Sequence, residues 1–188
     1  MKLNLSYLFD KKTYSVNLLD NRAHFQTYIK GALNETILND GWKIAYSEDY
    51  DEALEQYIEP TQSIKDLKGV EVPLSLNLQG YGKTHYLNTG YDFDGRNPGK
   101  LGEKIEIPNP VGLYLKDLEI GKEELDFRQI IDFKGFETAL YLYVNGEFVG
   151  YSENLYLDSF FDITPFIHEG KNRVAAFVFR YSTASWML

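Results

Sequence analysis

The stretch LYLYVNGEFVGY, residues 140–151, decides how this chain folds. Two apolar-rich arms lie on either side of the pair Asn145-Gly146. A two-residue type I′ turn needs positive φ at both central positions, and Asn-Gly is the preferred pair because both residues tolerate that conformation. The twist of this turn also matches that of the strands it joins. The stretch therefore predicts a β-hairpin whose register is fixed at Asn145-Gly146.

A second apolar stretch, VAAFVFR at residues 174–180, follows the turn signal EGKN at 169–172. Hydrophobic side chains occupy both of its alternating sets of positions. One set is Val174, Ala176 and Val178, and the other is Ala175, Phe177 and Phe179. Since a strand that is apolar on both faces is covered on both sides, we expect these residues in the centre of a sheet.

Four more segments have the composition of short strands and are separated by turns rich in Gly, Asn, Asp and Pro. They are GWKIAY (41–46), GVEVPLSLNLQGY (69–81), GLYLKDLEI (112–120) and DFRQIIDFKGF (126–136). Within 69–81, three leucines alternate and share one side, namely Leu74, Leu76 and Leu78. Together the segments predict an all-β fold, an antiparallel jelly-roll β-sandwich with an irregular N-terminal extension.

One short helix is expected within DYDEALEQYIEP, residues 49–60. Asp49 and Glu52 have the spacing of a capping box, and Pro60 ends the segment. The residues on one face of this helix are Ala53, Leu54, Tyr57 and Ile58.

The chain divides into two parts by its pattern. Residues 1–40 have mixed polarity and weak periodicity, which predicts an arm lying over the sandwich or against another domain or subunit, and 41–188 form the jelly-roll domain. The end, STASWML at 182–188, is apolar and directly follows a core strand. Because chain ends are usually polar and frayed, we expect that the chain is a fragment and that more sequence follows Leu188.

Composition excludes several classes of function. The net charge is −9 and no long basic run occurs, so nucleic acid is not an expected partner. The chain has no cysteine, which excludes disulfides and thiol chemistry and suits a reducing compartment. Its three histidines, His24, His85 and His168, are too scattered to predict a metal site. No segment approaches the roughly 18 apolar residues of a membrane span, and polar residues interrupt the N-terminus before a signal-peptide core develops. We expect a cytoplasmic protein with no membrane contact.

Two ligand-binding motifs are present only in part. Gly82-Lys83-Thr84 matches the tail of a phosphate-binding loop, but Asn77 stands where the first glycine is required. Asp92, Asp94 and Glu103 have calcium-loop spacing, but Arg96 occupies the position of an oxygen ligand. Neither motif predicts a site.

Carboxylates cluster at two places, and a pair of them could in principle cleave a glycoside. The clusters are Glu48, Asp49, Asp51 and Glu52, and Glu123 with Glu124. Both lie in polar, turn-like or helical surroundings, so we expect solvated surfaces and no catalytic residue in this chain. From the residues alone the chain is a β-sandwich that binds or scaffolds.

Four stretches in order resemble the N-terminal, sugar-binding jelly-roll domain of glycoside hydrolase family 2, and most closely that of its large bacterial β-galactosidases. They are VPLSLNLQGYGKTHYLNTGY (72–91), IPNPVGLY (107–114), LYVNGEFVGYSEN with FDIT (within 142–164), and GKNRVAAFVFRYSTASW (170–186). Upstream, DNRAHF (20–25) and LNDGWKIAY (38–46) are similar to stretches that precede the domain in those enzymes.

The resemblance implies a division of labour within a longer enzyme. Hydrolysis is retaining and uses two glutamates of a following (β/α)₈ barrel, which this chain lacks. The asparagine that hydrogen-bonds galactose hydroxyls falls on Asn88, and Thr89 is its neighbour at the pocket wall. Thr183 stands where a relative can use an aspartate to hold a structural Mg²⁺, and Leu76 replaces a family tryptophan. We therefore expect no cofactor in this chain, with Mg²⁺ and Na⁺ confined to the full-length enzyme.

The expected partners are a galactoside substrate, the remaining domains of the enzyme and further copies of the full-length protein. Two alternatives stay open at this point. The chain could be a stand-alone carbohydrate-binding module that uses tyrosine platforms, or the corresponding domain of a β-glucuronidase or β-mannosidase.

Overall fold

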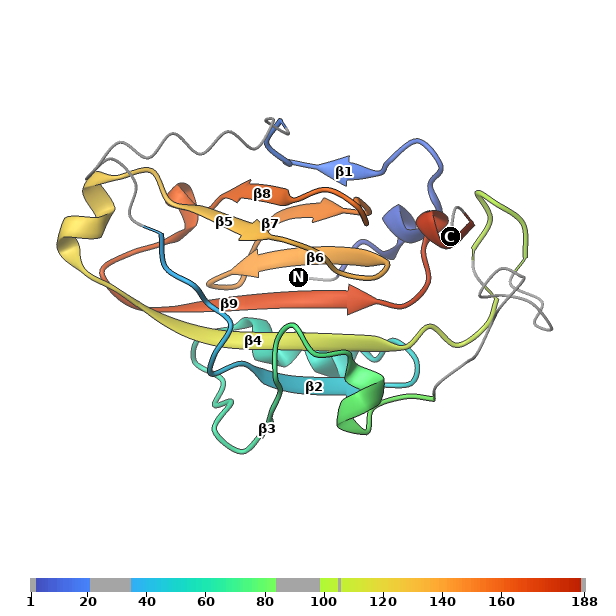
Figure 1. Ribbon diagram of the computed structural model, residues 1–188, viewed down its shortest axis with the longest axis horizontal. Coiled ribbons are helices and arrows are strands. Elements are labelled where there is room, and N and C mark those ends of the chain that lie inside the picture. Colours follow the sequence, from blue (N-terminus) through green and yellow to red (C-terminus); the bar gives the residue numbers. More distant parts are fainter. Residues whose placement is uncertain (1–2, 21–34, 84–98, 105, 187–188) are drawn as a thin grey trace.

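The computed structural model describes residues 3–20, 35–83, 99–104 and 106–186 (Figure 1). Within them, seven antiparallel strands form one sheet in the order β1-β7-β6-β9-β4-β2-β3, and β5 pairs with β8 in a second sheet. The strands are β1 (Ser15–Val16), β2 (Lys43–Ser47), β3 (Lys68–Gly69), β4 (Val111–Ile120), β5 (Ile130–Phe133), β6 (Ala139–Val144), β7 (Glu147–Ser152), β8 (Ser159–Asp162) and β9 (Gly170–Phe179).

The helical segments are short 3₁₀ helices between the strands. They are η1 (Leu5–Phe9), η2 (Glu52–Ile58), η3 (Leu76–Gln79), η4 (Lys122–Asp126), η5 (Thr164–Phe166) and η6 (Thr183–Trp186).

The hairpin predicted at Asn145-Gly146 is confirmed. It joins β6 to β7, and both turn residues have positive φ, 51° for Asn145 and 87° for Gly146. The Asn145 side chain adds a brace between segments, since its amide nitrogen donates to the Phe166 carbonyl at 2.8 Å and its oxygen accepts from the Arg173 amide at 2.8 Å. The turn is therefore tied to β9 as well as to its own strands.

Strand β9 is central, as its two apolar faces predict. It pairs with β6 on one side and along its whole length with β4 on the other. Its two sets of alternating side chains enter two different core clusters, Ala175 and Phe177 in one and Val174 and Ala176 in the other. The large sheet is thus buried on both faces at its middle.

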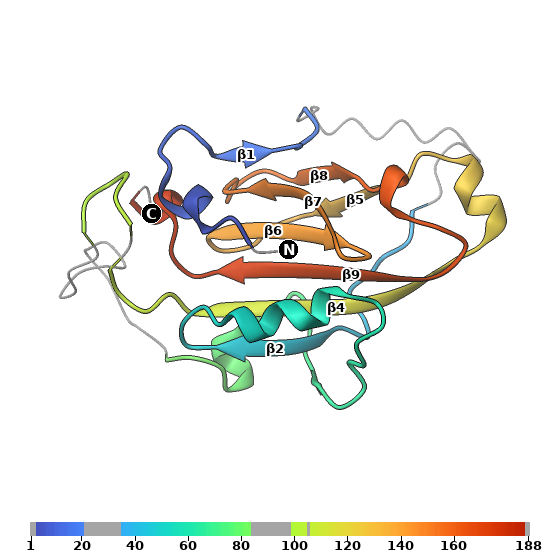
Figure 2. The same ribbon diagram turned by 180° about the vertical axis from the view of Figure 1, so that it is seen from behind.

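Different layers cover the two faces of the large sheet. On one face lies the β5–β8 sheet (Figure 1). Its Ile131 and Phe161 belong to the same core cluster as Leu140 and Leu142 of β6. On the other face lie η1 and η2, and Figure 2 shows η2 running across β4 and β2. The all-β antiparallel sandwich is confirmed, with a second sheet that has two strands in the described residues.

The strand predicted over 69–81 is wrong for most of its length. Pairing ends with β3 at Gly69, and the chain then forms η3. Proline at position 73 has no N–H for a ladder. The Gln79 side chain satisfies backbone groups locally, because its amide nitrogen donates to the Glu71 and Leu74 carbonyls at 3.1 and 2.9 Å. Of the alternating leucines, Leu74 and Leu78 are exposed.

The short helix predicted within 49–60 is present as η2, but its cap was assigned to the wrong residue. Asp51 caps it, accepting from the Ala53 amide at 2.8 Å. Asp49 instead accepts from the amides of Tyr50 and Asn109 at 2.9 Å. Leu54 and Ile58 are buried as expected, whereas Ala53 is exposed, because a 3₁₀ helix has three residues per turn and presents a narrower face than an α-helix.

The described part of the N-terminal segment packs on the sandwich. Leu3 and Leu8 are buried, and the Tyr7 ring lies 5.3 Å from Tyr151 and 6.1 Å from Tyr141. Strand β1 extends the large sheet by pairing with β7. The boundary at residue 40 stays a prediction.

Arg173 is a fully buried charge at the start of β9. Its guanidinium donates to the carbonyls of Tyr57, Glu59 and Gln62 at 2.9, 3.3 and 3.1 Å, so it holds the end of η2 and the loop that follows. Its Nε also lies 2.5 Å from an Asp117 carboxylate oxygen. Burial alone would raise the pKa of Asp117, but hydrogen bonds from Arg173 and Lys171 outweigh it and hold that pKa below its usual value.

Candidate functional site

The two residues predicted to contact substrate, Asn88 and Thr89, lie outside the described residues, as do His24, His85, Asp92 and Asp94. The described chain reaches Lys83 and resumes at Gly99. The structure does show how the chain is held just before this segment, at the end of the sheet where β9 finishes.

Arg180, which directly follows β9, anchors the chain at Lys83. Its Nη1 donates to the Lys83 carbonyl at 3.2 Å, and its guanidinium lies 5.5 Å from the centre of the Tyr181 ring. A cation over an aromatic face is stabilised by the ring quadrupole. Arg180 is therefore held in place by its position directly after β9 and by the Tyr181 ring, and it in turn holds Lys83.

Tyr46 of β2 forms the neighbouring contact. Its ring lies 5.4 Å from that of Tyr81, and a Cβ added at Gly82, which has φ +68°, would meet its hydroxyl at 2.8 Å. Burial, with the nearby Glu48 carboxylate, raises the pKa of Tyr46. Only glycine allows the chain to pass this close to the phenol.

The same end of the sheet is braced by side chains that hydrogen-bond to the backbone of Arg180 and Tyr181. The Asn109 side chain donates to the Tyr181 carbonyl and accepts from the Tyr181 amide, both at 2.8 Å. The Thr138 hydroxyl donates to the Arg180 carbonyl at 3.0 Å. Because Asn109 and Thr138 are buried, these bonds are shielded from water. The chain that connects β9 to η6 is therefore a rigid support.

Glu153 is a buried carboxylate beside η6, and nothing in the sequence singled it out. It accepts hydrogen bonds from the hydroxyls of Tyr151 and Thr183 and, at 3.0 Å, from the Ala184 amide. Burial raises the pKa of Glu153, although these three donors act in the opposite direction. The carboxylate joins the end of β7 to the last described turn of the chain.

The resemblance set Thr183 at a family magnesium position. Here its hydroxyl already donates to Glu153, and among the described residues no group of three His, Cys, Asp or Glu side chains could hold a metal ion. Magnesium requires near-octahedral oxygen coordination. The donor set around Thr183 in the described chain does not supply it.

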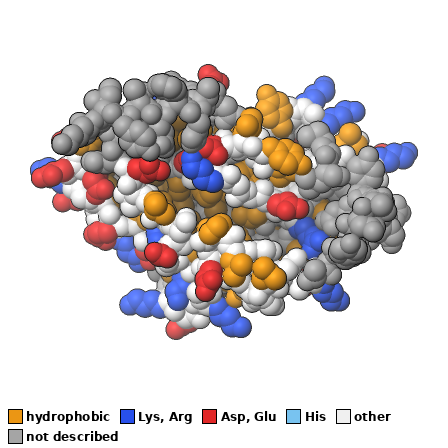
Figure 3. Space-filling view, in the orientation of Figure 1, with side chains coloured by type: hydrophobic (Ala, Val, Ile, Leu, Met, Phe, Trp, Pro, Cys, Tyr) orange, Lys and Arg blue, Asp and Glu red, His pale blue; other side chains and the backbone are white. Residues whose placement is uncertain are grey.

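Both acidic clusters are solvated surfaces, as expected. All six of these carboxylates belong to exposed residues. Those of Asp49, Asp51 and Glu124 accept from nearby backbone amides, with Glu124 closing on the Gly121 amide at 2.6 Å. Figure 3 shows acidic and basic side chains mixed along the outline of one face, so this face presents no single sign of charge to a ligand.

The tyrosines of the hairpin are core residues. Tyr141 and Tyr151 are 0% exposed and Tyr143 is 2% exposed. They pack on other rings at centroid distances of 4.6 to 6.1 Å. These three side chains cannot serve as sugar platforms.

Every described helix is too short or too polar to cross a membrane.

The profile of the family described as glycosyl hydrolases family 2, sugar binding domain, matches residues 36–188. This chain belongs to that family. The family 2 domain is 36% identical to a β-galactosidase of Clostridium acetobutylicum over 99% of the chain and 22% of that protein. It is 34% identical to a β-galactosidase of Streptococcus thermophilus over 97% of the chain and 18% of that protein. The chain therefore spans about a fifth of these relatives.

Solved structures show the same fold for this family 2 domain. A Bacteroides uniformis β-glucuronidase superposes with a TM-score of 0.55 at 18% identity, covering 77% of this chain and 14% of that one. A family 2 member from Bacteroides cellulosilyticus gives a TM-score of 0.55 at 16% identity, covering 80% and 18%. At these identities the likeness supports the fold alone.

Proposed function

We propose that this chain is the N-terminal sugar-binding domain of a β-galactosidase that hydrolyses terminal β-D-galactosides of the lactose type. The observation that carries the proposal is the match to β-galactosidases at 34% to 36% identity over nearly the whole chain. The relatives are about five times longer than this chain, and we assign the cleavage step to residues outside it.

Within that enzyme, we assign substrate contact to Asn88, with Thr89 beside it. An amide side chain can both donate to and accept from sugar hydroxyls. The anchored chain at Lys83 supports this role, because Arg180 and Tyr46 fix the backbone five residues before Asn88. A positioned binding residue depends on such a rigid support.

Two alternatives are less well supported. A stand-alone module with hairpin tyrosine platforms lacks them, since those rings are buried. A β-glucuronidase or β-mannosidase domain is less favoured because the closer sequence relatives are β-galactosidases, whereas the β-glucuronidase named above is only 18% identical.

The setting of the full-length enzyme follows from the same proposal. Its partners are a galactoside, the remaining domains and further copies of itself in a homo-oligomer. In this proposal the chain itself holds no cofactor, and any Mg²⁺ or Na⁺ belongs to the full-length enzyme. The compartment is the cytoplasm, which the absence of cysteine suits.

The test is Asn88→Ala in the full-length enzyme. One lost hydrogen bond to a neutral hydroxyl contributes about 0.5–1.5 kcal/mol, so kcat/KM for lactose should fall roughly two- to tenfold. Asn39→Ala, at an exposed asparagine, is the matched control and should leave both constants unchanged. Wild-type kcat and KM for Asn88→Ala would show that it does not reach the sugar. Preference for a nitrophenyl glucuronide over the galactoside would favour the alternative enzyme.

A further inference from the structure

One edge of the large sheet is open for part of its length. Strand β3 pairs with Lys43 and Ile44 of β2 and no further. The Val70 amide donates to the Trp42 carbonyl at 3.0 Å, so the backbone groups of Trp42 point toward β3. Because this direction alternates along a strand, the N–H and C=O of Tyr46 point the same way, beyond the last paired residue. Within the described chain, neither group has a hydrogen-bond partner on this side.

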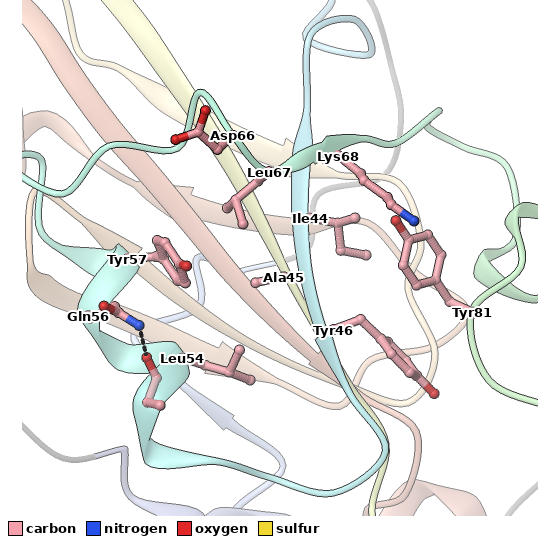
Figure 4. A pocket seen from close by; sticks show the side chains of 11 residues that line it. Ile44, Ala45, Tyr46, Leu54, Gln56, Tyr57, Asp66, Leu67, Lys68 and Tyr81 are labelled. Atoms are coloured by element: carbon pink, nitrogen blue, oxygen red, sulfur yellow. Dashed lines mark hydrogen bonds between the residues drawn. The ribbon is translucent and has the colours of Figure 1, made fainter.

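A groove runs along this open edge, and its walls come from both faces of the sheet (Figure 4). On the face covered by η2, the lining side chains include Leu54, Tyr57 and Leu67, which belong to the core cluster of that face. On the opposite face they include Tyr46 and Tyr81, whose ring centres lie 5.4 Å apart. An added β-strand fits such a place, because its backbone pairs with the edge and its side chains alternate between the two faces.

The edge of β5 differs, because charged residues protect it. Among the described strands, β5 pairs with β8 alone. Lys134, which directly follows β5, forms ion pairs with Asp132 and Asp158 at 2.5 and 2.9 Å. Natural sheets use charged residues to prevent pairing at their edges. Residues 44–47 of β2 carry no charge, so the edge beside the groove lacks this protection.

We propose that the open edge of β2 pairs with an extended segment from the part of the enzyme that lies outside this chain. The chain spans about a fifth of its relatives, so about four fifths of the polypeptide is available to supply the segment. Its residue beside Tyr46 would pack on the rings of Tyr46 and Tyr81, and the flanking residues would pack on the wall that η2 provides. The segment is therefore apolar on both of its faces.

The size of the contact favours a segment of the same polypeptide over a second molecule. Two main-chain hydrogen bonds and a small apolar contact are far less than a stable interface between separate molecules requires. A segment of the same polypeptide is present at high effective concentration, so a small contact is enough to hold it. The inference rests on the proposed function, because it needs a longer enzyme, and it adds a contact that the proposed function does not specify.

The test is amide hydrogen exchange of the full-length enzyme, resolved to single residues by fragmentation in the mass spectrometer. Ile130 is the matched control. The Ile163 amide donates to the Gln129 carbonyl at 2.9 Å, so Gln129 points toward β8 and the amide of Ile130 points toward the open edge of β5. After correction for intrinsic rates, the Tyr46 amide should exchange roughly tenfold or more slowly than that of Ile130. Protection of Tyr46 no greater than that of Ile130 overturns the proposal.

Photo-cross-linking identifies the segment. A benzophenone amino acid in place of Asp66, an exposed residue that lines the groove, should link to residues outside the 188-residue chain. The same probe in place of Lys122, which is exposed on η4, should not give this product. Mixed ¹⁴N- and ¹⁵N-labelled copies show whether a link lies within one polypeptide. Links from position 66 only to a second copy, or only to residues of this chain, overturn the proposal.

Hydrolysis of lactose by the same full-length enzyme separates the two proposals. An active enzyme in which Tyr46 is unprotected overturns the edge pairing and leaves the proposed function standing. An enzyme that protects Tyr46 but does not hydrolyse galactosides supports the edge pairing and contradicts the proposed function.

Discussion

At the scale of single residues, Gly146 shows two constraints at one position. Its φ is +87°, and a Cβ there would lie 2.7 Å from a Glu59 carboxylate oxygen. The first constraint belongs to the type I′ turn and was predictable from Asn-Gly. The second comes from the loop after η2, which the turn approaches only in the folded chain.

Gly146→Val should lower the free energy of unfolding by about 1–3 kcal/mol, because a β-branched residue is forced to positive φ. Urea denaturation of the isolated chain measures it. Gly135→Ala is the control, since nothing lies within 4 Å of a Cβ there and its stability should match wild type. Equal stability of wild type and Gly146→Val would contradict the strained turn.

Glu153 makes stability depend on pH. Because burial raises its pKa in the folded chain, the folded state binds the proton more tightly than the unfolded state. Its contribution to stability is fully present below the ordinary pKa of about 4.5 and is lost as pH rises through the folded pKa. Glutamine, which has the same shape and no charge, would not lose this stability as the pH rises.

Glu153→Gln should therefore be about as stable as wild type near the ordinary pKa of 4.5 and more stable at neutral pH, as measured by urea denaturation under both conditions. Comparing variant with wild type cancels the titration of other groups. A variant less stable than wild type at neutral pH would show that the hydrogen bonds of Tyr151, Thr183 and Ala184 outweigh the cost of burying the charge.

At the scale of elements, Arg173 connects β9 to η2, two elements more than a hundred positions apart in the chain. A buried guanidinium is tolerated only where its donors are satisfied. Here three carbonyls and Asp117 satisfy them. Without the arginine, the Tyr57 and Gln62 carbonyls would lose this donor, whereas Asp117 would keep its ion pair with Lys171.

Arg173→Ala should destabilise the fold by about 3 kcal/mol or more, since a fully buried side chain is removed and the carbonyls of Tyr57 and Gln62 lose their donor. Arg128→Ala removes an exposed ion pair with Asp162 and should cost less than about 1 kcal/mol, since the Arg128 side chain is 56% exposed. Thermal and urea denaturation compare the two. A small effect of Arg173→Ala would mean that water replaces its contacts.

The elements that were predicted correctly are those determined by residues close together in the sequence. The hairpin follows from Asn145-Gly146, and the central strand follows from apolar residues on both faces of 174–179. The error over 69–81 arose because alternating leucines look like a strand, whereas Pro73 interrupts the ladder and Gln79 stabilises a turn. The buried contacts of Arg173 and Glu153 were not predictable, because their partners come from distant parts of the chain.

At the scale of the whole molecule, the sandwich gathers the features of the site at one end of the large sheet. The ends of β2 and β9 place Tyr46 and Arg180 beside Gly82 and Lys83, and η6 closes over Glu153 at the end of β7. The sheet thus acts as a rigid support for the chain up to Lys83.

The last prediction concerns this division of labour. The isolated 188-residue chain should fold, because its described residues already form a seven-stranded sheet with a core cluster on each face. It should nevertheless show no hydrolysis of o-nitrophenyl β-galactoside. A retaining glycosidase needs two carboxyl groups about 5–5.5 Å apart across a cleft. The clustered carboxylates of the chain instead lie on exposed surface, and Glu153 is engaged by three donors in the interior. Circular dichroism tests folding, nitrophenol release tests activity, and the full-length enzyme is the positive control. Turnover by the pure, folded chain above the buffer rate would show that it contains a catalytic pair of its own.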